Sequence, residues 1–119
     1  MRALKNDTAT LNIAVSVVAP GITLTEIISG RQPGQSLADW AIAMRKQGVP
    51  INDPAEIARA VVWLMSLGIG GNGKGLLIQA GRTADLEAGI AKTRKSWMGE
   101  EQLGLFRGGR QAPLFPNKL

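Results

Sequence analysis

Asn12-Ile-Ala-Val-Ser-Val-Val-Ala19, followed by Pro20-Gly-Ile-Thr-Leu-Thr25, is the stretch that decides the fold. Its first part is an apolar run of strand length, rich in β-branched residues, and the Pro-Gly pair ends it. The run predicts a strand over residues 12–19 that is buried on both faces, as in a parallel sheet covered by helices. Ligands of such sheets bind beyond the carboxyl ends of the strands. We therefore expect backbone groups and two hydroxyls of residues 20–25 to meet a polar ligand.

Helix signals precede and follow this strand. Residues 1–11 indicate the end of a helix that runs into the strand. Ser36 and Asp39 have the spacing of a capping box and predict a helix over residues 37–47. The apolar residues of that helix form a single stripe, which consists of Leu37, Trp40, Ala41 and Met44.

A second strand is predicted further along the chain. Asp53-Pro-Ala-Glu56 combines a capping residue, a first-turn proline and a capping-box acid, and it predicts a long helix that ends at Gly68. Residues 76–80 then form an apolar strand, and residues 83–95 have a helical pattern. After Trp97 we expect an extended tail.

This order of elements predicts an α/β fold with one strand–helix–strand unit and two parallel strands. Two such strands, each apolar on both faces, do not make a sheet that can cover itself. We therefore expect the chain to form a homo- or hetero-oligomer, or to be a piece of a larger domain.

Composition excludes several kinds of chemistry. The sequence contains no Cys, no His and no Tyr, so thiolates, imidazoles and phenols are absent. The net charge is +5, but the basic residues are scattered. The densest cluster (Lys92, Arg94, Lys95) indicates a solvated face near a helix end, and the alternative is a phosphate-binding patch. We expect no nucleic-acid partner. No apolar run is long enough for a membrane span and no signal pattern is present, so we expect a cytoplasmic protein and no membrane partner.

Residues 68–75 match two phosphate-loop spacings, the dinucleotide fingerprint and the P-loop. Both motifs require the order strand, glycine turn, helix, because the helix N-terminus holds the phosphate. Here a helix enters and a strand leaves, so we interpret the glycines as a helix end and a flexible connection.

Three segments together resemble the C-terminal third of the short-chain dehydrogenase/reductase family: NIAVSVVAPGITLT, DPAEIARAVVWLMS and GNGKGLLIQAG. The resemblance implies a partial Rossmann-like, doubly wound fold that holds the last two parallel strands with flanking helices. Residues 1–81 would be the C-terminal part of that domain, and residues 82–119 a helical and extended tail. The tail also resembles fungal 15-hydroxyprostaglandin-dehydrogenase-like members, which implies a role in secondary metabolism.

By this resemblance, the turn after the first strand closes over the nicotinamide end of NAD or NADP. Pro20 and Gly21 would shape the turn, and the Ile22 backbone, Thr25 and Thr23 would contact the cofactor. The alternative is that both threonines satisfy the turn backbone. The loop and small helix of residues 26–48 match the substrate lid, where Trp40 and Met44 would face an alcohol or ketone substrate or else pack on the sheet.

The catalytic Ser, the Tyr-x-x-x-Lys pair and the phosphate-binding glycine turn of that family are not found in this sequence. Without the tyrosine the substrate oxygen has no proton partner. We therefore expect an NAD(P)-dependent oxidoreductase of truncated form, inactive as this 119-residue chain and without catalytic or metal-binding residues of its own. The alternative is a non-catalytic interaction module that pairs with a full-length relative.

Overall fold

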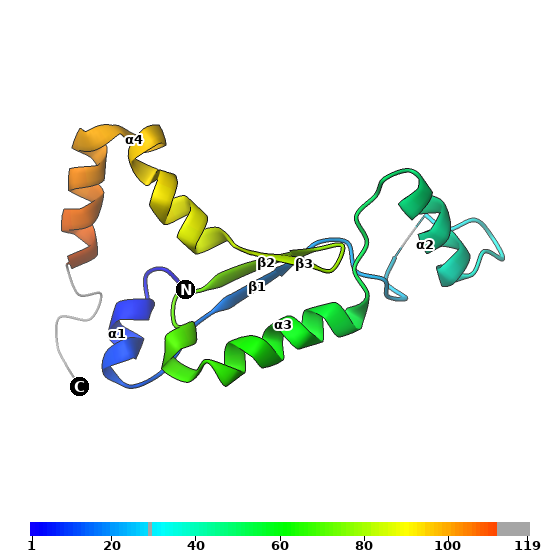
Figure 1. The fold of residues 1–119 in the computed structure, drawn as a ribbon, viewed down its shortest axis with the longest axis horizontal. Coiled ribbons are helices and arrows are strands. Elements are labelled where there is room, and N and C mark those ends of the chain that lie inside the picture. Colours follow the sequence, from blue (N-terminus) through cyan, green and yellow to red (C-terminus); the bar gives the residue numbers. More distant parts are fainter. Residues whose placement is uncertain (29, 112–119) are drawn as a thin grey trace. The chain divides into compact units, whose positions relative to one another are not determined.

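The structure, a computed structural model, describes residues 1–28 and 30–111 (Figure 1). It is mixed α/β, with a three-stranded sheet and flanking helices. The elements follow in the order α1 (Lys5–Thr10), β1 (Val17–Pro20), α2 (Leu37–Lys46), α3 (Pro54–Ser66), the 3₁₀ helix η1 (Gly68–Gly71), β2 (Gly75–Gln79), β3 (Arg82–Asp85) and α4 (Leu86–Gln111).

The chain divides into two compact units. The first contains Met1–Val17, Leu67–Gly75 and the described residues from Asp85 onward. The second contains Val18–Ser66 and Leu76–Ala84, and thus most of the sheet together with α2 and α3.

The sheet has the strand order β1-β2-β3. The Val17 N–H donates to the Lys74 carbonyl at 3.0 Å, and the Gly21 N–H donates to the Ile78 carbonyl at 2.8 Å. Both partners advance by the same number of residues, so β1 and β2 are parallel, as the sequence predicts.

β3 is a strand where the sequence predicts a helix. Two residues with positive φ, Ala80 (46°) and Gly81 (73°), join β2 to β3, which is the requirement of a type I′ hairpin. The helix predicted over residues 83–95 is confirmed from Leu86 onward, and only its start is wrong, because the hairpin continues the sheet to Asp85. A sheet of only two parallel strands is wrong for the same reason.

The first strand is shorter and more exposed than the sequence predicts. β1 begins at Val17, and Ile13 and Val17 are 50% and 43% exposed. The prediction of a strand buried on both faces is therefore wrong, since among the described residues β1 is an edge strand that pairs with β2 alone. The buried apolar cluster at the sheet is formed instead by β2 and by α3, which lies along the sheet (Figure 1). This core consists of Ala60, Leu64, Leu76 and Ile78, with Val18 and Ile57 against it.

Both predicted internal helices are confirmed by their caps. The Ser36 hydroxyl accepts from the Asp39 N–H at 3.0 Å and begins α2. The Glu56 carboxylate accepts from the Asp53 N–H at 2.8 Å and begins α3.

The prediction of an extended tail after Trp97 is wrong for the described residues up to Gln111. α4 continues to Gln111 through a bend at Gly99, whose φ of 78° and ψ of 167° are not helical. Residues 112–119 of that tail lie outside the described residues.

Candidate functional site

The candidate site is the turn Pro20–Thr25, which follows directly on the carboxyl end of β1. The Gly21 N–H donates to the Ile78 carbonyl and so extends the β1–β2 pairing into the turn. A Cβ atom at Gly21 would lie 3.2 Å from that carbonyl oxygen and 3.2 Å from the Gln79 Cγ. Glycine therefore allows the turn to lie directly against β2.

Asn52 is hydrogen-bonded to the same turn. Its side chain is fully buried, with an exposure of 0%. Its Nδ2 donates to the Ile78 carbonyl at 2.9 Å, and its Oδ1 accepts from the Gly81 N–H at 3.2 Å. Its backbone N–H donates to the Ile22 carbonyl at 2.8 Å, and its carbonyl accepts from the Leu24 N–H at 2.9 Å. One residue thus connects the turn after β1, the strand β2 and the β2–β3 hairpin.

Sequence reasoning missed Asn52. A polar amide directly before Asp53-Pro54 and directly after the buried Ile51 is the one available signal. It marks a polar residue that enters an apolar environment, where a hydrogen-bond partner for every polar atom is required.

The predicted cofactor-binding residues lie together in this turn but are not equivalent. The Thr23 hydroxyl donates to the Gly21 carbonyl at 3.0 Å, so it satisfies the turn backbone. The Thr25 side chain is exposed and makes no hydrogen bond within the described residues. The Ile22 N–H likewise has no hydrogen-bond partner there, and Pro20 is exposed at the end of β1. Ile22 and Thr25 therefore offer the polar groups of the turn.

Trp40 and Met44 lie apart from the turn in the chain, on α2. Both are half-buried, and they share their helix face with Ala41, which is only 1% exposed. Part of each side chain therefore packs against protein. Among the described residues no hydrogen bond joins either one to residues 20–25.

The glycine-rich segment has the predicted order of helix, glycines and strand. Its amides are used internally: the Gly73 N–H donates to the Val15 carbonyl at 2.9 Å, and the Lys74 N–H donates to the Gly71 carbonyl at 3.1 Å. The Lys74 ammonium lies 3.3 Å from the Asp85 carboxylate. In the described part of the chain, no group of three or more acidic side chains is placed to hold a metal ion.

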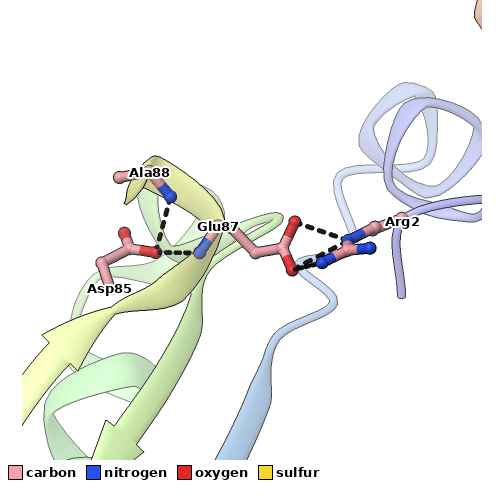
Figure 2. A network of polar contacts seen from close by, with 4 residues as sticks. All are labelled: Arg2, Asp85, Glu87 and Ala88. Atoms are coloured by element: carbon pink, nitrogen blue, oxygen red, sulfur yellow. Dashed lines mark hydrogen bonds and ion pairs between the residues drawn. The ribbon is translucent and has the colours of Figure 1, made fainter. Parts of the chain in front are cut away.

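Asp85 and Glu87 form a charged cluster at the start of α4 (Figure 2). The Arg2 guanidinium donates to both Glu87 carboxylate oxygens, at 2.9 and 2.8 Å. The Asp85 carboxylate accepts from the N–H groups of Glu87 and Ala88, at 3.1 and 3.2 Å. This cluster caps the helix and ties it to the N-terminal segment.

The pKa of both carboxyls is lowered in the folded chain. For Glu87 the main cause is the hydrogen bond from Arg2. For Asp85, partial desolvation would raise the pKa, but hydrogen bonds from the Ala88 N–H, the Lys74 ammonium and the Gly75 N–H together lower it.

These shifts predict a loss of stability in acid. Because the pKa values are lower in the folded chain, the unfolded chain binds more protons as the pH falls through the ordinary carboxyl range, at about 4. The contribution of these two carboxylates to the free energy of unfolding should therefore be complete above that pH range and should decrease as the pH falls through it. Denaturant titrations at pH 7 and pH 3 measure the difference, which should be smaller in Glu87→Gln. Glu26→Gln, at an exposed ion pair, is the control, and an equal acid loss in all three proteins would contradict the assignment.

Comparisons of the chain with protein-family models, with curated proteins and with solved structures each gave no match. No helix of the described residues is long and apolar enough to cross a membrane.

Proposed function

We propose that this chain supplies the nicotinamide-side turn of an NAD(P) site of short-chain dehydrogenase/reductase type, in a partial Rossmann-like fold. The observation that carries the proposal is the turn Pro20–Thr25, held at the carboxyl end of β1 by Ile78 and Asn52. In open α/β sheets this is the edge at which ligands bind.

The polar groups of the turn fit the carboxamide of a nicotinamide ring. A carboxamide carries one acceptor oxygen and two N–H donors. The Ile22 N–H would donate to the oxygen, and the Thr25 hydroxyl would accept from the amide nitrogen. When bound, the cofactor supplies the hydride-transferring ring. The protein groups that position it here are neutral, and the turn itself carries no charged side chain before Glu26.

The proposal assigns no proton transfer to this chain. The sequence contains no Tyr and no His, and a hydride moved to or from an alcohol or ketone carbon requires a proton donor or acceptor at the oxygen. We therefore propose that the 119-residue chain positions a cofactor ring but does not oxidise or reduce a substrate alone, and that its sheet is completed by other strands.

Titration with nicotinamide mononucleotide, followed by ¹⁵N–¹H spectra, tests the turn. We expect weak saturable binding with the largest shifts in residues 21–25, and a loss of affinity of about tenfold in Thr25→Val, because one hydrogen bond to the carboxamide of the ligand is lost. Thr10→Val, at an exposed helix-end threonine, is the matched control. Shifts confined to other residues, or turnover of an alcohol or ketone with NAD(P)H by the purified chain, would contradict the proposal.

A second candidate function, an interaction module, is favoured by the apolar surface of the second unit. On α3, Val62 and Met65 are 64% and 74% exposed. Within the described residues, β1 lies at an edge of the sheet and pairs with β2 alone, and the outer side of an edge strand can pair with another chain. An apolar helix face next to an open strand edge is a surface that a second copy or a full-length relative could cover.

Light scattering coupled to size-exclusion chromatography tests this second function. We expect a dimer of the unmodified chain, and a shift towards monomer in Met65→Glu, because a charge placed in an apolar interface is not solvated. Leu105→Glu, which places the same charge at a 66% exposed position on α4, should leave the dimer intact. A monomer for the unmodified chain would exclude the module as a self-pairing one.

A further inference from the structure

The bend of α4 borders an open cavity that neither proposed function uses. Gly99 kinks the helix with a φ of 78°, a conformation that favours glycine. The two arms that it joins are seen in Figure 1. Residues 91–95 of the first arm and residues 100–107 of the second line a cavity of about 390 Å³. This volume lies within the range of small-molecule sites.

The cavity is strongly basic. Its charged lining residues are four cations and one acid, a net charge of +3, namely Lys92, Arg94, Lys95, Arg107 and Glu100. The sequence places three of these cations next to one another, which alone indicates a solvated helix face. The bend adds Arg107 from the opposite arm, so cations approach the same cavity from two sides.

The cations of the cavity differ in what they already contact. Lys95 forms an ion pair with Glu100. The Arg94 guanidinium lies over the Phe106 ring, 4.4 Å from its centroid, which leaves the in-plane N–H groups directed away from the ring. Lys92 and Arg107 form no ion pair within the described residues. These two side chains are therefore available to an anion.

One lining residue of the cavity is a buried apolar side chain, Leu103, which is 7% exposed, whereas the small residues Ala91 and Gly104 line it at exposed positions. An apolar side chain among several cations matches a ligand that carries an anionic group on an organic body. Arg in particular pairs with phosphate through two parallel hydrogen bonds.

We propose that the bend of α4 is a binding site for a small organic phosphate. Arg107 and Lys92 contact the phosphate group, and Leu103 contacts the organic body. The site lies in the first unit and is independent of the nicotinamide-side turn, so either assignment can fail without the other.

The test is titration of the full chain with phenyl phosphate at constant ionic strength, measured by calorimetry and by ¹⁵N–¹H spectra. We expect saturable binding that shifts the amides of residues 91–107, and weaker binding of inorganic phosphate, which has no organic body to contact Leu103. Arg107→Gln and Lys92→Gln should each weaken phenyl phosphate by about tenfold, because each removes a charge-assisted hydrogen bond. Both residues are exposed, and far-UV circular dichroism checks that each variant keeps its helices.

Arg59→Gln, at an exposed arginine of α3, is the matched control and should bind phenyl phosphate unchanged. Absence of saturable binding, equal affinity for inorganic phosphate, or an effect of Arg59→Gln as large as that of Arg107→Gln would overturn the proposal. Tighter binding of a single-stranded oligonucleotide with a steep salt dependence would overturn it as well, in favour of a nucleic-acid surface.

Discussion

Replacing Asn52 with alanine is expected to lower the free energy of unfolding by about 2–3 kcal/mol, because two backbone groups lose a hydrogen-bond partner and the packing of a fully buried side chain is lost. The groups are the Gly81 N–H and the Ile78 carbonyl, and the latter retains its bond from Gly21. The expected loss is therefore smaller than for two completely unpaired groups. Denaturant unfolding followed by circular dichroism measures the change.

Asn6→Ala is the matched control for this substitution. Asn6 lies exposed on α1 and makes no side-chain hydrogen bond within the described residues, so its replacement should change stability by less than about 0.5 kcal/mol. In Asn52→Ala we also expect the amide signals of Ile22 and Leu24 to broaden or shift, because the turn loses its attachment. Equal stability of the two variants would show that Asn52 does not hold the turn.

The largest loss of stability is expected for Ile78→Ala, at about 3–4 kcal/mol, because the substitution leaves a cavity in the core. Ile78 is 0% exposed and contacts the cluster that includes Leu64 and Leu76. Ile42→Ala removes the same atoms from a 53% exposed position on α2 of the same unit. It should change the free energy of unfolding by less than about 0.5 kcal/mol, and a comparable loss in both variants would contradict the assigned core.

Local signals predicted the helices of the second unit. The caps at Ser36 and at Asp53-Pro54 depend on residues three positions apart, so α2 and α3 begin where the sequence indicates. The parallel pair of β1 and β2 was predicted as well, because a helix crossover between two apolar runs allows few other arrangements. The Rossmann-like assignment of this pair stays a prediction.

Tertiary contacts determined what the sequence did not predict. The apolar run before Val17 does not extend β1, since the Val15 N–H donates to the Asn72 side chain at 3.0 Å and the Ser16 hydroxyl donates to the Gly71 carbonyl at 2.8 Å. These side-chain and loop partners replace a strand ladder. β3 lacks the alternation of a half-buried strand, and only the turn before it marks it.

The turn at the end of β1 was predicted in position, but its hydrogen bonds were not. The Pro-Gly break located the turn at Pro20–Thr25. Which of the two threonine hydroxyls bonds to the turn backbone, Thr23 or Thr25, depends on the backbone conformation. Asn52 lies far from the turn in the sequence, and its side-chain partners, the Ile78 carbonyl and the Gly81 N–H, are brought to it only by the tertiary fold. The bend at Gly99 was missed because a single glycine is also compatible with a continuous helix.

The β1–β2 register has a consequence for the order in which the chain folds. The β2–β3 hairpin and α3 consist of neighbouring residues and can form on the order of microseconds. β1 must instead pair with residues that follow α2 and α3 in the sequence, as the hydrogen bonds Val17–Lys74 and Gly21–Ile78 require. Closing the long loop between β1 and β2 lowers the chain entropy before any stabilising contact between the two strands has formed. β1 and its turn should therefore dock last, onto a hairpin already formed, and the free edge of β2 is open to another strand in the meantime.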